Sequence, residues 1–209
     1  MRTPETSNVV TKPAKNPEAE ALLLSALGQA DLARALDRLY ETYAASVERW
    51  VRRLAGPNAD VEDLMHDVFV VAVRRRSEFR GEGKLSTWLF RITEHIVHKR
   101  RSRERMRRLL RLRYQDSMVP VQAPSPTPLE ELERQQRCAH LYAALDRLPD
   151  KYRTVSVLYD IDGLSAQEVA QLLGIHPNAV WVRVHRARAM LLAQLSESKQ
   201  DRVRGNDEE

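Results

Sequence analysis

The sequence predicts an all-α protein made of two small helical domains with a proline-rich linker between them. Over most of the 209 residues, apolar side chains recur at steps of three and four, the spacing that gives an α-helix one apolar face. No convincing segment alternates apolar and polar residues as a half-buried strand does. Four of the ten prolines fall within residues 114–130, where they prevent helix formation and keep the chain extended. Residues 196–209 are expected to form a frayed polar tail.

Three helices are expected in the N-terminal part of the chain. Residues 1–17 carry three prolines and no periodicity, so they read as a disordered leader. A short helix at about 18–27 comes next. A long amphipathic helix over residues 31–55 follows it and ends at a Gly-Pro pair, because these two residues break helices. Another helix is expected over residues 60–79.

A strongly basic block follows these helices. After a glycine-punctuated loop at 80–84, a fourth helix is expected to begin near Ser86 and to run into residues 99–113, which contain nine basic residues and one acidic residue. This block has a charge of +8 and the rest of the chain has −3, within a net charge of +5. Like charges at i,i+4 destabilise a helix, so the block indicates a polyanionic partner such as nucleic acid. A solvated helix surface is the alternative interpretation.

Residues 131–195 are predicted to form the second domain, and they contain a helix-turn-helix pattern. Ser165 and Glu168 have the spacing of a capping box. Gly174 suits the left-handed position after a helix, and Pro177 suits the first turn of the next helix. That next helix has an apolar face and, opposite it, arginines without acidic residues, as a helix in the major groove requires. An ordinary helical hairpin is the alternative.

Composition excludes several classes of protein. The apolar runs are far shorter than a membrane span, and the N-terminus has no apolar signal-peptide core, so we expect no membrane insertion and a cytoplasmic location. Cys138 is the only cysteine, which excludes an intramolecular disulfide and a cysteine-based zinc site. Neither a glycine-rich phosphate loop nor a nucleophile–base or metal spacing stands out. We therefore expect no enzyme activity, no cofactor, no metal and no small-molecule substrate.

Two stretches of the sequence resemble a known family. The run from Asp60 to Arg101, DVEDLMHDVFVVAVRRRSEFRGEGKLSTWLFRITEHIVHKRR, resembles region 2 of bacterial RNA polymerase sigma factors of the extracytoplasmic-function (ECF) group. The run LPDKYRTVSVLYDIDGLSAQEVAQLLGIHPNAVWVRVHRARAML resembles region 4 of the same group. The resemblance implies a bacterial transcription initiation factor. Residues 18–113 would bind core polymerase and recognise and melt the minus-ten promoter element, and residues 131–195 would bind the minus-thirty-five element.

The resemblance implies a polymerase-binding face on the helix that begins near residue 60. In the family, this helix docks on the clamp of the largest polymerase subunit. The residues at the matching positions are Asp60, Asp63, Leu64, His66, Asp67 and Phe69. Exposed carboxylates suit a basic partner, whereas Leu64 and Phe69 suit the core equally well. His66 stands where the family usually has Gln.

The resemblance also implies contacts to the melted minus-ten element. The loop at 80–86 matches the family's loop that captures a flipped base, and the helix after it faces the opened DNA. The residues at these positions are Arg80, Lys84, Ser86, His95, His98, Lys99, Arg100 and Arg101. His95 stands where the family usually has Asn. His95 and His98 have no third ligand that would complete a metal site.

The last implied set lies on the recognition helix and reads the minus-thirty-five element. Its members are Asn178, Trp181, Val182, Arg183, His185, Arg186 and Arg188. Trp181 and Val182 replace polar residues common in the family and suit apolar contact with a thymine methyl group. Expected partners are the clamp and flap of core polymerase, double-stranded and melted promoter DNA, and an anti-sigma factor. Two alternatives remain: a stand-alone helix-turn-helix regulator, and a sigma-like protein that titrates an anti-sigma factor.

Overall fold

The computed structural model describes residues 29–81, 83–113 and 129–206, and every regular element within them is helical. The elements are α2 (Gln29–Ala55), α3 (Val61–Arg74), the 3-10 turn η1 (Arg76–Glu78), α4 (Leu85–Arg113), α5 (Leu129–Asp146), α6 (Asp150–Ser156), the π-helical turn η2 (Val157–Ile161), α7 (Ala166–Leu173) and α8 (Pro177–Asn206). The predicted all-α class is confirmed for these residues. None of their helices is long and apolar enough to cross a membrane. The predicted leader, the short helix at 18–27 and the linker up to residue 128 lie outside them.

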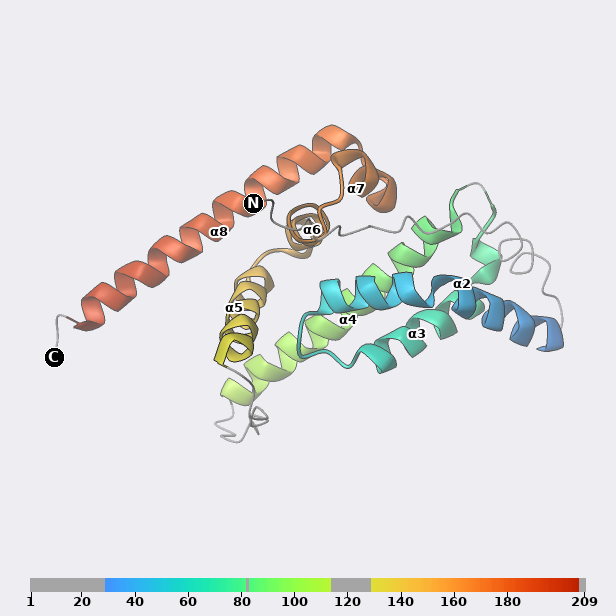
Figure 1. Ribbon diagram of the computed structural model, residues 1–209, viewed down its shortest axis with the longest axis horizontal. Coiled ribbons are helices and arrows are strands. Elements are labelled where there is room, and N and C mark those ends of the chain that lie inside the picture. Colours follow the sequence, from blue (N-terminus) through green and yellow to red (C-terminus); the bar gives the residue numbers. More distant parts are fainter. Residues whose placement is uncertain (1–28, 82, 114–128, 207–209) are drawn as a thin grey trace, which may run out of the picture.

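Helices α2, α3 and α4 form a first helical module, in which α2 and α3 lie along α4 (Figure 1). The apolar face predicted for α2 is buried. Its members Leu39, Tyr43, Val47, Trp50 and Leu54 are at most 4% exposed. The Trp50 ring meets the Phe90 ring of α4 edge-on at 5.3 Å between centroids. This core fixes α3 and α4 with their polar faces outward.

Helix α3 begins as predicted but ends earlier. Asp60 caps its start, since the Asp60 carboxylate accepts a hydrogen bond from the backbone N–H of Asp63 at 3.1 Å. The helix ends at Arg74 rather than near Phe79, and η1 follows. Phe79 is buried, with its ring centroid 5.5 Å from that of Trp88. Phe79 therefore follows η1 and packs in the core, and it is not part of a longer α3.

Helices α5 to α8 form a second helical module, and its helix-turn-helix has the capping predicted from the sequence. The Ser165 hydroxyl accepts a hydrogen bond from the Glu168 backbone N–H at 3.3 Å, and the Glu168 carboxylate accepts one from the Ser165 N–H at 3.0 Å. Gly174 ends α7 with φ of +59°, a left-handed conformation that glycine adopts without strain. The apolar face of α8 is buried at Val180, Val184 and Ala187.

Helix α8 continues past the point where a frayed tail was expected. It runs to Asn206, whereas the sequence predicted an end near residue 195. Residues 196–204 contain neither glycine nor proline, so nothing in them interrupts the backbone hydrogen bonding of the helix. Figure 1 shows this end of α8 extending clear of the other helices.

The two modules are packed against each other, and their buried residues form one continuous core. The contact begins at the end of α2. There Gly56 has φ of +95°, and a Cβ at this position would lie 2.9 Å from the ring of Tyr142 in α5. The Tyr142 hydroxyl donates a hydrogen bond to the carbonyl oxygen of Arg53 at 3.1 Å. On the far side of the interface, α7 contacts α4.

Candidate polymerase and nucleic-acid interfaces

One face of α3 points outward with polar side chains on it. Asp63, His66 and Asp67 are exposed. Leu64 and Phe69 are only 2% and 3% exposed, so they pack in the core of the first module. The structure thus divides the residues predicted to bind polymerase into an exposed polar group and a buried apolar pair.

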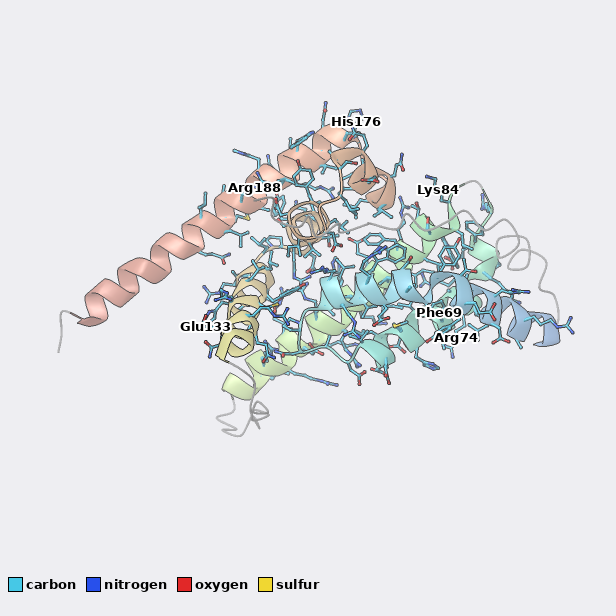
Figure 2. The ribbon with its side chains drawn as sticks, viewed as in Figure 1. Phe69, Arg74, Lys84, Glu133, His176 and Arg188 are labelled. Carbon is cyan, nitrogen blue, oxygen red and sulfur yellow. The ribbon has the colours of Figure 1, made fainter. Side chains whose placement is uncertain are left out.

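A shallow groove lies beside this face, between α2 and α3. Tyr40 of α2 is 51% exposed, and its ring centroid lies 4.9 Å from that of Phe69 (labelled in Figure 2). The residues that line the groove are Leu36, Asp37, Tyr40, Glu41, His66, Phe69 and Val70. The groove therefore has an apolar floor and acidic edges. The sequence analysis did not identify Tyr40 as a groove residue. A tyrosine next to the apolar face of an amphipathic helix can, however, indicate a partly exposed binding surface.

Several residues predicted to contact the minus-ten element lie along the first turns of α4 and before it. Arg80 and Lys84 are exposed, and Lys84 lies at the N-terminal end of α4 (Figure 2). Ser86 is 8% exposed and lies against the core. His95 and Lys99 are exposed nine and thirteen residues after Ser86, about two and a half and three and a half helical turns further along.

Arg100 of α4 and Asp63 of α3 form an ion pair. The sequence had assigned these two residues to different surfaces, one to DNA and one to polymerase. The structure joins the two surfaces at this pair. The pair is part-exposed on both sides, which leaves both groups accessible to solvent.

Arg101 is directed into the interface between the modules. Its side chain is 8% exposed, with one guanidinium nitrogen 2.7 Å from an Asp146 carboxylate oxygen and another 3.3 Å from an Asp150 oxygen. Arg105, one turn later, lies 4.0 Å from Asp150. Asp146 and Asp150 belong to α5 and α6 of the second module, so both carboxylates approach the basic block from across the interface.

His98 and Glu94 lie on the same side of α4. The His98 Nε2 is 3.1 Å from the Thr154 Oγ1 of α6, and burial lowers the pKa of His98 below its usual range. Burial also raises the pKa of Glu94, against the opposing effects of a hydrogen bond to Thr154 and the charges of Arg91 and Arg183. Arg183 lies on α8, so a predicted minus-thirty-five residue shares the electrostatic environment of α4.

Arg153 of α6 is a buried charge that the sequence reasoning missed. Its side chain is fully buried and donates a hydrogen bond to the carbonyl oxygen of Leu54 at the end of α2. Its Nε lies 3.3 Å from an Asp146 oxygen, and its guanidinium lies over the Tyr142 ring at 5.8 Å. Burial lowers the pKa of Arg153 to about 10, so the side chain remains charged at neutral pH.

The recognition helix α8 keeps most of its predicted residues exposed. Asn178, Trp181, Val182, His185 and Arg186 are all exposed, and Arg183 is half-buried. The exposed face adjoins a shallow groove lined in part by Lys151 and Tyr152 of α6, two residues that the sequence reasoning did not single out. An Arg186 nitrogen is 3.4 Å from the Tyr152 hydroxyl.

Two residues of η2 engage α8 side chains. Asp160 accepts hydrogen bonds from the Nε and Nη2 of Arg188 at 3.2 and 2.5 Å. The Tyr159 ring lies 5.3 Å from the Trp181 ring. Arg188, which the sequence predicted to contact DNA, therefore has an intramolecular carboxylate partner. Within the described residues, no group of three or more His, Cys, Asp or Glu side chains is placed to hold a metal ion.

The fold and these surfaces define a helical DNA-binding protein of the helix-turn-helix class, in which the first helical module carries the strongly basic block of α4. Residues 39–107 match the family model for Sigma-70 region 2, and residues 138–191 match that for Sigma-70 region 4. The chain is 34% identical over 184 residues to the ECF RNA polymerase sigma factor SigE of Mycolicibacterium smegmatis, covering 86% of this chain and 68% of that protein. The chain belongs to the ECF group of RNA polymerase sigma factors.

Other comparisons agree with this assignment. The chain is 29% identical over 187 residues to the RNA polymerase sigma factor CnrH of Cupriavidus metallidurans, covering 86% of this chain and 96% of CnrH. The solved structure of CnrH in complex with the cytosolic domain of CnrY has the same fold, with a TM-score of 0.53 at 24% identity, covering 86% of this chain and 96% of that one. The chain is accordingly a transcription initiation factor that binds core RNA polymerase and promoter DNA.

Proposed function

We propose that the groove between α2 and α3, together with the exposed face of α3, docks on the clamp of core polymerase. The observation that carries this assignment is the pairing of an apolar floor with acidic edges. Tyr40 and Phe69 supply the floor, and Asp37, Glu41 and Asp67 supply negative charge around it or beside it. Such a surface suits an amphipathic basic helix, because the apolar part is desolvated while the charges steer and orient the partner.

The loop before α4 and the exposed side of α4 are proposed to bind the melted minus-ten element. Arg80 and Lys84 are exposed cations beside glycines that allow close backbone approach. His95 and Lys99 continue this exposed line along α4. Cations near an extruded base recover by phosphate contact part of the free energy that unstacking costs.

The exposed N-terminal turns of α8 are proposed to bind the minus-thirty-five element in the major groove. Trp181 and Val182 offer apolar contact to thymine methyl groups, and His185 and Arg186 offer hydrogen bonds to bases or phosphates. Arg188 contributes less to DNA binding than the sequence alone would predict, because it already donates hydrogen bonds to Asp160. The second module also faces the polymerase flap in this proposal.

The remaining assignments rest on the family. We assign residues 18–113 to sigma region 2, residues 131–195 to sigma region 4 and residues 114–130 to the linker between them. The family matches at 39–107 and 138–191 fall inside the two assigned domains. The protein acts in the bacterial cytoplasm, has no catalytic site of its own, and has an anti-sigma factor as a further partner.

Reconstituted transcription tests this function. Purified chain is mixed with core polymerase and a library of promoter fragments, and the transcripts are sequenced from their 5′ ends. We expect starts downstream of a two-part sequence motif that core polymerase alone does not select. Absence of specific starts, together with tight operator binding by the free chain, would instead identify a stand-alone regulator.

A further inference from the structure

An aromatic pair lies beside the exposed N-terminal turns of α8, where Trp181 meets Tyr159 of η2. We infer that Tyr159 is a positioning residue for the minus-thirty-five element, which holds the Trp181 indole in the orientation that meets a thymine methyl group. Arg188 and Asp160 hold the Tyr159 ring in turn. The inference rests on the proposed function of α8 and adds to it a residue outside the recognition helix that sets base preference.

The first argument is the geometry of the aromatic pair. The centroids of the Tyr159 and Trp181 rings are 5.3 Å apart, and the ring planes make an angle of 67°, as in a favourable edge-to-face contact. Trp181 nevertheless remains 52% exposed. The protein therefore fixes one side of the indole and leaves the rest of the ring open to an external partner. A side chain that is already held in this way loses less conformational entropy on binding than one that turns freely.

The second argument is that the Tyr159 ring is itself supported. The guanidinium of Arg188 lies over this ring, 5.9 Å from its centroid, at the distance of a cation–π contact. Asp160, the next residue of η2, accepts two hydrogen bonds from the same guanidinium at 3.2 and 2.5 Å. Trp181 and Arg188 are about two turns apart on α8, so both reach Tyr159 from one side of the helix. Asp160, Arg188 and Tyr159 therefore form one connected support for the indole.

The third argument is the backbone of η2, which directs Tyr159 and Asp160 toward α8. The backbone N–H of Asp162 donates a hydrogen bond to the Val157 carbonyl oxygen, five residues earlier, at 2.9 Å. Val157 and Leu158 are buried, whereas Tyr159 is half-buried and Asp160 is exposed. Single π-helical turns of this kind are rare and occur frequently at functional sites. Here the wider turn lets two buried residues be followed directly by two residues that contact α8.

Val182, the other apolar residue proposed to contact DNA, has different surroundings. It is 50% exposed and lines the groove that also contains Lys151 and Tyr152 of α6. Adjacent residues of a helix point about 100° apart, so Val182 is directed away from the Tyr159 side of α8. A substitution in η2 should therefore affect the base contact of Trp181 and leave that of Val182 unchanged. The two contacts can be told apart at single thymines.

The primary test measures binding to single thymine methyl groups. Holoenzyme is reconstituted from core polymerase and the full chain, and its affinity is measured for a promoter selected in the transcription assay. Each thymine of the minus-thirty-five element is replaced in turn by deoxyuridine, which lacks the methyl group. We expect the wild-type holoenzyme to bind about threefold more weakly when the contacted thymine is replaced. Trp181→Ala should abolish the loss at one thymine and thereby identify it.

Tyr159→Leu removes the aromatic support and keeps an apolar side chain. At the thymine identified by Trp181→Ala, this variant should lower the preference for thymine over deoxyuridine from about threefold to about one, with the affinity for the deoxyuridine promoter unchanged. Tyr159→Phe is the matched control, because it keeps the ring and should keep the wild-type preference. A purely structural role of Tyr159 would weaken binding to both promoters equally, and that outcome would overturn the inference.

The support of the tyrosine ring is tested by Asp160→Asn, which weakens the hold on Arg188. We expect this variant to lower the thymine preference partway, because the Tyr159 ring remains in place. Glu133→Gln on α5 is the matched control, since it removes the same charge from a carboxylate that also pairs with an arginine, Arg137, at 3.2 Å. If both variants keep the full preference, Asp160 and Arg188 take no part in the positioning and this step of the inference is overturned.

A spectroscopic test reads the indole directly. The chain contains three tryptophans, so labelling with 5-fluorotryptophan gives three ¹⁹F resonances, of which Trp181→Phe identifies one. In the free chain, Tyr159→Leu should shift the Trp181 resonance toward that of a fully solvated fluoroindole, whereas Tyr159→Phe should leave it near its wild-type position. An unchanged resonance in Tyr159→Leu would show that Tyr159 does not hold the indole, and would overturn the inference.

The outcomes separate this inference from the proposed function. If no deoxyuridine replacement weakens binding by the wild-type holoenzyme, or if Trp181→Ala retains every loss, the proposed contact of Trp181 with DNA fails and the inference fails with it. If the wild-type holoenzyme shows the loss and Tyr159→Leu shows it in full, the contact stands and the inference alone is overturned.

Discussion

The outward faces of α3 and α4 belong to the same module but have different neighbours. On α3, Asp67 and His66 point into solvent beside the Tyr40 groove. On α4, Arg101 and His98 are covered by α5 and α6, and their polar atoms already have partners. Both faces carry the charges expected of binding surfaces. The difference teaches that charge alone does not tell which surface is available in the free chain, because an intramolecular carboxylate satisfies an arginine as well as an external anion does.

The largest expected effect comes from the buried charge that joins the modules. Arg153→Ala removes the hydrogen bond to Leu54 and the ion pair with Asp146, and leaves a cavity in the shared core, so we expect a loss of about 3–5 kcal/mol in the free energy of unfolding. Urea denaturation followed by circular dichroism measures this loss. The exposed Arg137→Ala serves as control and should keep the wild-type midpoint. Equal midpoints for both variants would show that the interface does not depend on Arg153.

A smaller effect is expected at the turn of the helix-turn-helix. Gly174→Ala places a Cβ in the left-handed region and against Arg91 of α4, so we expect a loss of about 2 kcal/mol. Gly163→Ala is the matched control, because Gly163 also has a positive φ, of +68°, but has nothing within 4 Å of a Cβ. Thermal unfolding of both variants separates backbone strain from the collision. If the two variants lose equal stability, the contact between α4 and the turn adds nothing.

A substitution on the exposed face of α3 should change the affinity for core polymerase and leave the free energy of unfolding unchanged. Asp67→Arg reverses an exposed charge, so we expect core polymerase to bind about tenfold more weakly because a rim charge sets orientation and association rate. DNA binding by the free chain should not change. Glu133→Arg is the control for charge reversal elsewhere, and biolayer interferometry with immobilised core polymerase measures the affinity. A matching change in DNA affinity for Asp67→Arg would mean that the two faces are not independent.

The smallest effect is a pH dependence at the α4 face. The pKa of His98 in the folded chain is lowered from its usual 6.5 by burial, despite the charge of Asp150 and with Arg101, Arg153 and His95 also nearby. The unfolded chain therefore binds an extra proton just below pH 6.5, so the folded chain loses stability as the pH falls through this window and keeps it above.

The matched variant for this pH dependence is His98→Gln, which retains a hydrogen-bonding side chain but does not titrate. The difference in the free energy of unfolding between wild type and His98→Gln should rise with pH toward 6.5, by less than about 1 kcal/mol. Comparing the two chains cancels the opposite contribution of Glu94. A flat difference between pH 5 and 7 would show that burial of His98 is incomplete in solution.

The sequence predicted what depends on near neighbours along the chain. The capping box of Ser165 and Glu168, the turn at Gly174 and the start of α8 at Pro177 were all predicted, since each rests on residues within a few positions. The apolar face of α2 was likewise predicted, from apolar residues that recur at steps of three and four. Leu64 and Phe69 were left open between core and surface, because an apolar residue at the edge of a stripe satisfies both patterns.

The contacts across the modules were not predictable in the same way. Arg153 and Leu54 are 99 positions apart, and no local pattern identifies a backbone carbonyl as the partner of a distant arginine. The one local hint was that Arg153 is the only charged residue between Lys151 and Asp160. The basic block did predict a counter-charge, and Asp146 and Asp150 supply part of it from within the chain.

Two hydrogen bonds bind the second module to the end of α2. They affect which substitutions the sequence can accept during evolution. Both end on main-chain oxygens, those of Arg53 and Leu54, where the last carbonyls of a helix have no partner within it. A substitution at either acceptor position leaves its oxygen in place. Selection on these two bonds therefore falls on the donors, Tyr142 and Arg153, whereas selection at Arg53 and Leu54 acts through their side chains, which form an ion pair with Asp162 and pack in the core, respectively.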